Sequence, residues 1–339
     1  MRAFVTGGSG FIGLELVRQL RARGDAVVAT VRQAGNADRL VELGCELVEG
    51  DLAAMPRAAL AEAMRGCDAV FHLAGSYRIG IPGSEHAAMY AANVVTTERV
   101  LDAAIAVAVP RVVHVSTGNV YGNARGQTVD ERYRRPQPPA FLSYYEETKY
   151  QAQLAAEQQI AAGAPILIAL PGTVYGPHDP SQLGGLIAQA MAGTLAAVTF
   201  PELGLNMVHV EDLAAGILLV HDRGRIGEGY NLGGVHASLR EVVQQAAALG
   251  GHRPPRLSVP TWLLRLLSPL GPVIGPVMGV APNLREVIRS SHQVSYSVSD
   301  EKARRELGYV TRDLDAGLRS LLAVWGGSGS ADILPPETR

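Results

Sequence analysis

The stretch Thr6-Gly-Gly-Ser-Gly-Phe-Ile-Gly13 separates a short apolar run at 3–6 from a helical pattern at 11–23. Its glycines satisfy a G-x-G-x-x-G spacing at 8, 10 and 13, and a G-x-x-G-x-x-G spacing at 7, 10 and 13. Glycine tolerates the positive φ of a tight turn, lets a pyrophosphate approach the backbone and allows the helix to pack closely on the strand. The stretch therefore predicts a strand–turn–helix unit that binds a dinucleotide at the helix N-terminus. The residues expected at the cofactor are Gly7, Gly10, Phe11, Ile12 and Gly13.

Strand and helix patterns alternate through the first half of the chain. Apolar strand-like runs occur at 26–31, 46–49, 69–73, 111–115 and 166–170, and helical stretches lie between them, for example at 56–64 and 87–107. Alternation of this kind predicts an α/β fold whose parallel sheet is covered by helices on both faces. We therefore expect a doubly wound Rossmann domain at residues 1–171, with returning segments near 206–232.

The pattern changes after Pro171, where glycine and proline interrupt it more often. Short strands are expected at 206–210 and 228–232, and helices at 239–249 and 299–307. This part of the chain predicts a smaller, discontinuous C-terminal α/β substrate lobe at residues 172–325. The last segment, 326–339, is rich in glycine, serine and proline, and we expect a loose tail there.

The composition excludes several classes of protein. The 339 residues are 47% hydrophobic, and 30 Lys and Arg balance 32 Asp and Glu, which leaves no strongly basic surface for nucleic acid. Cys45 and Cys67 fit neither a zinc spacing nor a disulfide framework, so we expect no metal site and a reduced, cytoplasmic setting. Prolines interrupt the apolar stretch 261–282, which argues against a membrane-spanning helix.

The ends of the second and third strands are expected to meet the adenosine half of the cofactor. A dinucleotide fold often places Asp or Glu after the second strand to bind the ribose 2′-hydroxyl of NAD, whereas an Arg accommodates the 2′-phosphate of NADP. The run Ala29-Thr-Val-Arg32 has no acid and ends in Arg32, which favours NADP and leaves NAD as the alternative. Asp51 and Leu52, after the third strand, are expected beside the adenine.

A second motif, Tyr145…Lys149, lies in a helical stretch that begins near 143. Residues i and i+4 of a helix share a face, so both side chains can point into one cleft. An ammonium group near a phenol stabilises the phenolate and lowers the pKa of the phenol. Such a tyrosine can exchange a proton with a reacting oxygen, which makes it a candidate general acid/base.

With these motifs in place, the chain resembles the extended short-chain dehydrogenase/reductases, also called the NAD-dependent epimerase/dehydratase family, to about Leu322. Its reductase-like features resemble the dihydroflavonol reductases, and the whole chain is similar to hopanoid-associated sugar epimerases. The motifs that carry the resemblance are the glycine stretch 6–13, Gly50-Asp-Leu52, Phe71-His-Leu-Ala-Gly75, Asn93, Val115-Ser-Thr-Gly-Asn-Val-Tyr-Gly122, Tyr145…Lys149, Pro171-Gly-Thr-Val-Tyr-Gly-Pro177, Val208-His-Val-Glu-Asp-Leu213 and Lys302-Ala-Arg-Arg-Glu-Leu-Gly-Tyr309.

The resemblance implies roles for particular residues. Tyr145 is implied to be the general acid/base, Lys149 to tune it and to bind the nicotinamide ribose, and Thr117 to hydrogen-bond the substrate oxygen. Asn93 is implied to support the backbone of the active site. The cofactor is implied to lie along Ala74, Gly75 and Ser76 after the fourth strand, with Pro171 and Val174 near the nicotinamide ring.

Three functions compete at this level. The first is an NADP-dependent reductase of a ketone or aldehyde on a mainly apolar molecule, which the Ala29–Arg32 run favours. The second is an NAD-dependent nucleotide-sugar epimerase or dehydratase. Such enzymes often carry Asn where this chain has Thr173 and Arg where it has Leu170, and both departures weaken that reading. The third is a non-catalytic dinucleotide-sensing protein, against which the intact Thr117, Tyr145 and Lys149 argue.

The substrate side of the cleft is less well marked in the sequence. We expect substrate contacts from Tyr77 and Arg78, which follow the turn that lines the cofactor, and from Asn119 and Tyr175. A homodimer through the helices that carry Asn93 and Tyr145 is common in the families that this chain resembles. The expected partner is a small-molecule carbonyl compound or alcohol.

Overall fold

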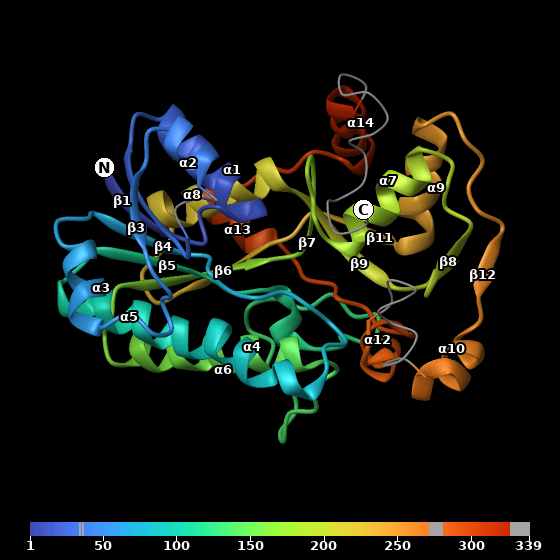
Figure 1. Cartoon of the computed structure of the whole chain (residues 1–339), viewed down its shortest axis with the longest axis horizontal. Coiled ribbons are helices and arrows are strands. Elements are labelled where there is room, and N and C mark those ends of the chain that lie inside the picture. Colours follow the sequence, from blue (N-terminus) through green and yellow to red (C-terminus); the bar gives the residue numbers. More distant parts are fainter. Residues whose placement is uncertain (34, 36, 271–280, 326–339) are drawn as a thin grey trace.

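The computed structural model describes residues 1–33, 35, 37–270 and 281–325 (Figure 1). Its centre is a seven-stranded sheet in the order β10-β6-β5-β4-β1-β2-β3, and every neighbouring pair is parallel. The chain leaves β1 in one direction to β2 and β3 and in the other to β4, which is the switch point where such sheets bind ligands. The strands are β1 (Arg2–Thr6), β2 (Ala26–Val31), β3 (Glu46–Glu49), β4 (Ala69–His72), β5 (Arg111–Val115), β6 (Ile166–Pro171) and β10 (Gly229–Leu232).

Helices cover both faces of this sheet. Neighbouring residues of a strand point to opposite faces, so Val5 packs with Leu16 and Ile217 on one side, whereas Phe4 packs with Leu101 on the other. Both faces are apolar, which explains the nearly continuous hydrophobic runs of the strands. The first face holds α1 (Phe11–Ala22), α8 (Val210–Arg223) and α13 (Glu301–Leu307), and the second holds α3 (Arg57–Met64), α5 (Thr96–Ala106) and α6 (Tyr144–Ala161). The short α2 (Asp38–Glu42) lies against α1 and β3.

The smaller lobe lies beside the carboxyl ends of the large sheet, on the right in Figure 1. It has its own apolar core, in which Tyr175, Met207, Val242 and Leu318 are among the most buried side chains. A three-stranded sheet, β11-β9-β7, and a two-stranded one, β12-β8, form its framework. Its elements are β7 (Thr173–Tyr175), α7 (Gln182–Met191), β8 (Ala197–Thr199), β9 (Gly204–His209), β11 (Val235–Ser238), α9 (Leu239–Leu249), β12 (Leu257–Val259), α10 (Thr261–Leu267), η5 (Ser268–Leu270), α12 (Leu284–Ser291) and α14 (Leu314–Trp325).

The predicted α/β Rossmann architecture is confirmed, and two local predictions need refinement. The expected helix at 87–107 is three pieces, α4 (His86–Tyr90), the π-helical η3 (Ala91–Val95) and α5. Of the returning segments, β10 is a strand of the large sheet and α8 packs against that sheet. β9 belongs to the small lobe. The expected tail at 326–339 lies outside the described residues. No helix in the described part of the chain has the length and apolar character needed to cross a membrane.

Candidate active site

The glycine turn forms a close-packed cradle at the end of β1. Gly7 has φ +71°, and a β-carbon there would lie 2.7 Å from the backbone nitrogen of Ala74. A β-carbon at Gly13 would overlap the carbonyl oxygen of Gly7, so α1 can approach the turn only without a side chain at this position. The N–H of Gly10 donates to that same carbonyl at 3.0 Å. This backbone fits a dinucleotide pyrophosphate at the N-terminus of α1, where the first N–H groups have no partner within the helix.

Asn93 holds the second wall of the cradle. Its side-chain oxygen accepts from the N–H of Ser76 at 2.7 Å, and its side-chain nitrogen donates to the Ser76 carbonyl at 3.1 Å and to the Thr148 hydroxyl at 2.9 Å. Gly75 passes so close that a β-carbon would lie 2.9 Å from the Asn93 oxygen. The π-helical turn carries this asparagine, and such turns are frequent at functional sites. Asn93 therefore ties the loop that follows β4 to α6.

His72 extends this network below the cofactor cradle. One ring nitrogen lies 2.7 Å from the Thr6 hydroxyl and the other 2.9 Å from the Thr97 hydroxyl. The Thr97 hydroxyl in turn donates to the Asn93 carbonyl at 2.7 Å. Burial, with a smaller contribution from Lys149, lowers the pKa of His72 to about 3. A neutral imidazole with both nitrogens engaged braces the strand ends.

Three candidate catalytic groups meet where β5 ends and α6 begins. Ser143 caps α6 by accepting from the N–H of Glu146 at 3.1 Å, which sets Tyr145 in the first turn. The Tyr145 phenol lies near enough to the side chain of Thr117, the residue that caps η4 (Gly118–Tyr121), for Thr117 to lower its pKa. Lys149 follows one turn later, and its ammonium donates to the carbonyl of Val115 at 3.1 Å.

The electrostatics of this cluster differ from the expectation drawn from the Tyr145…Lys149 spacing. Burial raises the pKa of Tyr145 above that of a free phenol, the nearby Tyr77 adds to the rise, and the Thr117 side chain opposes it. The Lys149 ammonium donates to the Val115 carbonyl and is not among the causes of this shift. Burial also lowers the pKa of Lys149 to about 8. The described site therefore holds a protonated phenol, ready to donate a proton.

Aromatic side chains border the open side of Tyr145. The ring of Tyr77 meets it edge to face, with 4.8 Å between the ring centres, and Tyr77 is 60% exposed. Tyr296 of the small lobe lies close enough for both phenols to act on its pKa, which burial raises, and its hydroxyl donates to the Ser290 carbonyl at 3.2 Å. No sequence motif marks Tyr296, because the contact depends on how the small lobe folds back over α6.

The structure distributes the other predicted substrate residues differently. Arg78 is half-exposed and forms an ion pair with Glu85, so its guanidinium already has a partner within the chain. The N–H of Asn119 donates to the Thr117 hydroxyl at 3.3 Å, which keeps that residue at the cleft. Tyr175 is 2% exposed in the core of the small lobe. A substrate contact from Tyr175 is therefore corrected to a packing role, because its strand β7 turns the ring inward against α14.

The remaining predicted cofactor residues lie around the cradle. Arg32 is exposed directly after β2, and Asp51, also exposed, accepts from the N–H of Ala53 at 3.0 Å in a tight turn. Leu52 is buried in the second core, and Pro171 ends β6 in a buried position. Partly buried positions are taken by Phe11, Ile12 and Val174. Within the described residues, no group of three His, Cys, Asp or Glu side chains could hold a metal ion.

A family model for the NAD dependent epimerase/dehydratase family matches residues 3–233, which include the cradle, the network of Asn93 and the catalytic candidates. The chain belongs to this family. It is an extended short-chain oxidoreductase, epimerase or dehydratase that binds NAD or NADP.

Relatives from both branches of the family cover nearly the whole chain. A dihydroflavonol 4-reductase-like protein of Synechocystis sp. is 32% identical over 314 residues, which cover 90% of this chain and 89% of that one. The 4-hydroxy-2-methyl-3-oxo-4-farnesyl-3,4-dihydroquinoline-1-oxide ketoreductase of Stigmatella aurantiaca is 33% identical, covering 92% of each chain. Among solved structures, a dTDP-glucose 4,6-dehydratase of Streptomyces venezuelae with NAD bound is 26% identical, with a TM-score of 0.75, and the match covers 96% of this chain and 98% of that one.

Proposed function

We propose that this protein is an NADP-dependent reductase that acts on a ketone or aldehyde of a mainly apolar molecule. The observation that carries the proposal is the buried phenol of Tyr145, which lies close to Thr117 beside a glycine cradle that fits a dinucleotide. The bound cofactor would supply the hydride for the carbonyl carbon. Reduction requires a proton donor to the carbonyl oxygen, and a phenol with a raised pKa keeps its proton at neutral pH.

Each group at the site has a place in that reaction. The Thr117 hydroxyl, already within reach of the phenol, orients the carbonyl oxygen. Tyr145 donates its proton to that oxygen as the alcohol forms. Lys149 holds its charge against the Val115 carbonyl one turn below and would bind the ribose hydroxyls of the cofactor. Asn93 holds the Ser76 backbone at a fixed position relative to α6, so the distance between the cofactor and the phenol stays constant.

The preference for NADP depends on Arg32. This side chain is exposed immediately after β2, where the second strand of a dinucleotide fold meets the adenosine ribose. No Asp or Glu occupies the run Ala29–Arg32, so a carboxylate to accept from a 2′-hydroxyl is missing at this strand end. A planar guanidinium can bind a 2′-phosphate through two parallel hydrogen bonds.

The apolar character of the substrate follows from what surrounds the phenol. Tyr145 packs in a small cluster with Ile81, Met89 and Tyr144, and the exposed ring of Tyr77 forms its outer edge. Such a wall favours an apolar molecule over a charged sugar nucleotide. The ketoreductase of Stigmatella aurantiaca, which this chain resembles along nearly its full length, carries a farnesyl group in the name of its substrate.

A second candidate is an NAD-dependent nucleotide-sugar epimerase or dehydratase, which the similarity to the NAD-bound dehydratase of Streptomyces venezuelae favours. Elimination of water would require a further acid or base beside Tyr145. The residues that follow Thr117 on η4, Gly118 and Asn119, have no ionisable side chain. We therefore rank this function second.

The cofactor that the purified protein holds separates the two candidates. A reductase should release its cofactor readily, show tighter binding of NADPH than of NADH, and oxidise NADPH when a long-chain or polycyclic ketone is added. Tightly held NAD that survives gel filtration, together with turnover of a nucleotide sugar without net consumption of cofactor, would overturn the proposal in favour of the epimerase or dehydratase.

A further inference from the structure

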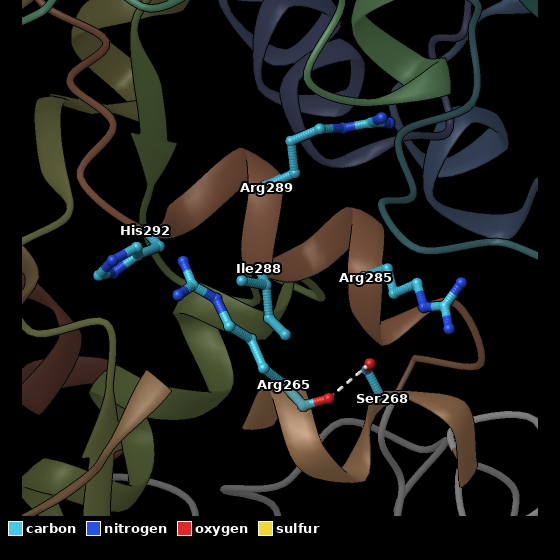
Figure 2. Close-up of a pocket in the computed structure, with 6 residues that line it drawn as sticks. All are labelled: Arg265, Ser268, Arg285, Ile288, Arg289 and His292. Atoms are coloured by element: carbon cyan, nitrogen blue, oxygen red, sulfur yellow. Dashed lines mark hydrogen bonds between the residues drawn. The ribbon is translucent and has the colours of Figure 1, made fainter. Parts of the chain in front are cut away.

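A basic cavity lies on the surface of the small lobe, outside the cleft described above. It lies between α10 and α12 (Figure 2). Its volume is about 340 Å³. Figure 2 also shows the Arg265 and His292 side chains on one flank and Arg285 on the other. The six residues that line it are Arg265, Ser268, Arg285, Ile288, Arg289 and His292.

The positive charge of this cavity is not neutralised within the described part of the chain. Arg265 and Arg285 are exposed and have no carboxylate within 4.0 Å there, and Arg289 uses its Nε to donate to the Leu142 carbonyl at 2.7 Å. The nearest acid in sequence, Glu286, turns the other way and accepts from the N–H of Tyr144 at 3.1 Å. The chain as a whole carries a net charge of −2, so this cationic group is a local feature.

Two large apolar side chains lie exposed on the helix that carries Arg265. Trp262 is 65% exposed and Leu266 is 68% exposed, and their spacing of four residues puts both on one face of α10. The opposite face of α10 is anchored, because Leu264 and Leu267 pack against a core that contains Phe200 and Leu284. The helix is therefore held in place while its outer face offers apolar surface to something outside the chain.

This surface lies one helix away from the catalytic tyrosine. α12 supplies Arg285 and Arg289 to the cavity, and from its other side Glu286 accepts from the backbone N–H groups of Gly80, at 3.3 Å, and Tyr144, at 3.1 Å. Those two residues are close neighbours of Tyr77 and Tyr145. Whatever binds at the cavity is thus placed at the rim of the cleft.

We propose that α10 and α12 dock the protein onto the surface of an anionic phospholipid bilayer. The cavity takes a lipid phosphate beside Arg265, Arg285 adds positive charge on the opposite flank, and Trp262 and Leu266 enter the boundary between headgroups and acyl chains. Trp prefers this boundary, and interfacial helices combine exposed apolar residues with Arg or Lys. A free phosphate would explain the cavity but leave the adjacent apolar face unused. The docking does not depend on the reductase reaction, although it would bring the cleft to membrane-dissolved substrates.

Sedimentation of the full chain with lipid vesicles tests this proposal. We expect binding to vesicles of phosphatidylcholine with a quarter of phosphatidylglycerol, and weak or no binding to phosphatidylcholine alone. Binding should fall steeply in about 1 M salt, where charges are screened beyond about 3 Å. Bound protein should show a blue shift of tryptophan fluorescence that Trp262→Ala abolishes while leaving the signal of Trp325.

Two double variants distinguish binding through this surface from non-specific attraction of positively charged residues to the vesicles. The double variant Arg265→Glu/Arg285→Glu should bind the anionic vesicles about tenfold more weakly or worse. A matched reversal at two exposed arginines, Arg65→Glu at the C-cap of α3 and Arg319→Glu on α14, should stay within about twofold. Unchanged melting temperature and unchanged reduction of a water-soluble ketone would show that the variants are folded.

Three outcomes would overturn the docking surface. The wild-type chain could bind anionic and neutral vesicles equally, both double variants could lose binding equally, or Trp262 could prove to mediate self-association in sedimentation velocity runs without lipid. Binding of inorganic phosphate alone, with no vesicle binding, would assign the cavity to a soluble anion and also reject the proposal. A failure of the reductase assay would leave all of these measurements valid, so the two proposals fail separately.

Discussion

The two regions of the molecule build their halves of the site in different ways. Around the large sheet, backbone geometry dominates: Gly7 and Gly13 pass within van der Waals contact of other main chain, and Asn93 braces a loop through three hydrogen bonds. In the small lobe, the side chain of Tyr296 lies beside Tyr145 on the open side of the cleft. A backbone that must pass close to other atoms requires glycines at fixed positions, which can be recognised in the sequence. A wall formed by side chains from distant segments has no such pattern. The large sheet therefore indicates the class of reaction, and we expect the lobe to set the substrate.

The largest expected effect belongs to the phenol of the large-sheet region. Tyr145→Phe removes the proton donor and should lower turnover by about 10³-fold, within the range that general acid catalysis contributes. Cofactor affinity, measured by fluorescence titration with NADPH, should change less than twofold, because the cradle is untouched.

Tyr121 offers a matched control for that substitution. It is also a buried tyrosine near the end of β5, but its hydroxyl donates to Asn231 at 3.0 Å, away from the reacting groups. Tyr121→Phe should keep most of the activity and lose about 1 kcal/mol of stability. A Tyr145→Phe protein with more than a tenth of wild-type turnover would remove Tyr145 from the mechanism as the proton donor.

Two buried asparagines, one in each region, test whether only the large-sheet region supports turnover. Asn93 and Asn206 are each 1% exposed, and Asn206 braces the small lobe by accepting from Gly234 at 3.0 Å and donating toward His236 and Val298. Each change to Ala leaves buried partners unsatisfied and should cost about 1–3 kcal/mol of unfolding free energy. Only Asn93→Ala should also lower kcat, by about 10- to 100-fold, because it lets the cofactor wall move relative to Tyr145.

Thermal unfolding and steady-state kinetics on both variants check this expectation. If Asn206→Ala lowers kcat as much as Asn93→Ala does at equal stability loss, the division of roles between the sheet and the lobe is wrong. If neither variant affects kcat, Asn93 is a structural residue only.

The same contrast explains how much the sequence could predict. Strands β2, β3 and β5 appear with the predicted bounds, because buried parallel strands need uninterrupted apolar residues. The π-turn at Asn93 was missed, since the surrounding residues continue a helical pattern and only the hydrogen bonds to Ser76 and Thr148 call for the extra residue. The roles assigned to Tyr145, Lys149 and Thr117 stay predictions. The position of Tyr296 and the burial of Tyr175 could not be predicted, because both depend on packing between segments distant in sequence.

The pKa of the Tyr145 phenol shows a further limit of what residue spacing can predict. A tyrosine and a lysine at positions i and i+4 are predicted to lie on one helix face, and the expected result was a lowered pKa of the phenol. Desolvation reverses the sign, since the Tyr145 side chain is buried and burial is the largest cause of its pKa shift. Burial is a property of the folded chain and leaves no local pattern.

Arg32 gives the next effect in size. Removing its guanidinium by Arg32→Ala should weaken NADPH binding by about 10- to 100-fold, the equivalent of about 1.5–3 kcal/mol for a hydrogen bond to a charged group. NADH binding should change less than twofold, because it has no 2′-phosphate. Arg39→Ala, at an exposed arginine of the neighbouring α2, is the matched control and should leave both affinities unchanged. Equal losses for the two cofactors would mean that Arg32 makes no contact with the 2′-phosphate.

The smallest effect concerns Lys149 and the pH. Its pKa of about 8 lies below the value of about 10.4 in an unfolded chain, so the unfolded state binds the extra proton between these values. The free energy of unfolding should therefore rise with pH from about 8 to 10.4, by up to about 1.4 kcal/mol per unit, before other groups intervene. Over the same window kcat/KM for reduction should fall, by about tenfold between pH 7.5 and 9, because the charge that binds the cofactor is lost.

Opposite slopes of stability and activity in one pH window are a specific signature of a buried lysine that works only when charged. Lys149→Met should flatten the stability profile and lower activity at every pH, whereas Lys149→Arg should remove the alkaline fall because a guanidinium keeps its proton. The chain contains only two lysines, Lys149 and Lys302, so titration of ¹³C-lysine-labelled protein by NMR can follow the group directly. An activity profile that falls above pH 8 in Lys149→Arg as steeply as in the wild type would assign the limb to a different group and separate Lys149 from the reaction.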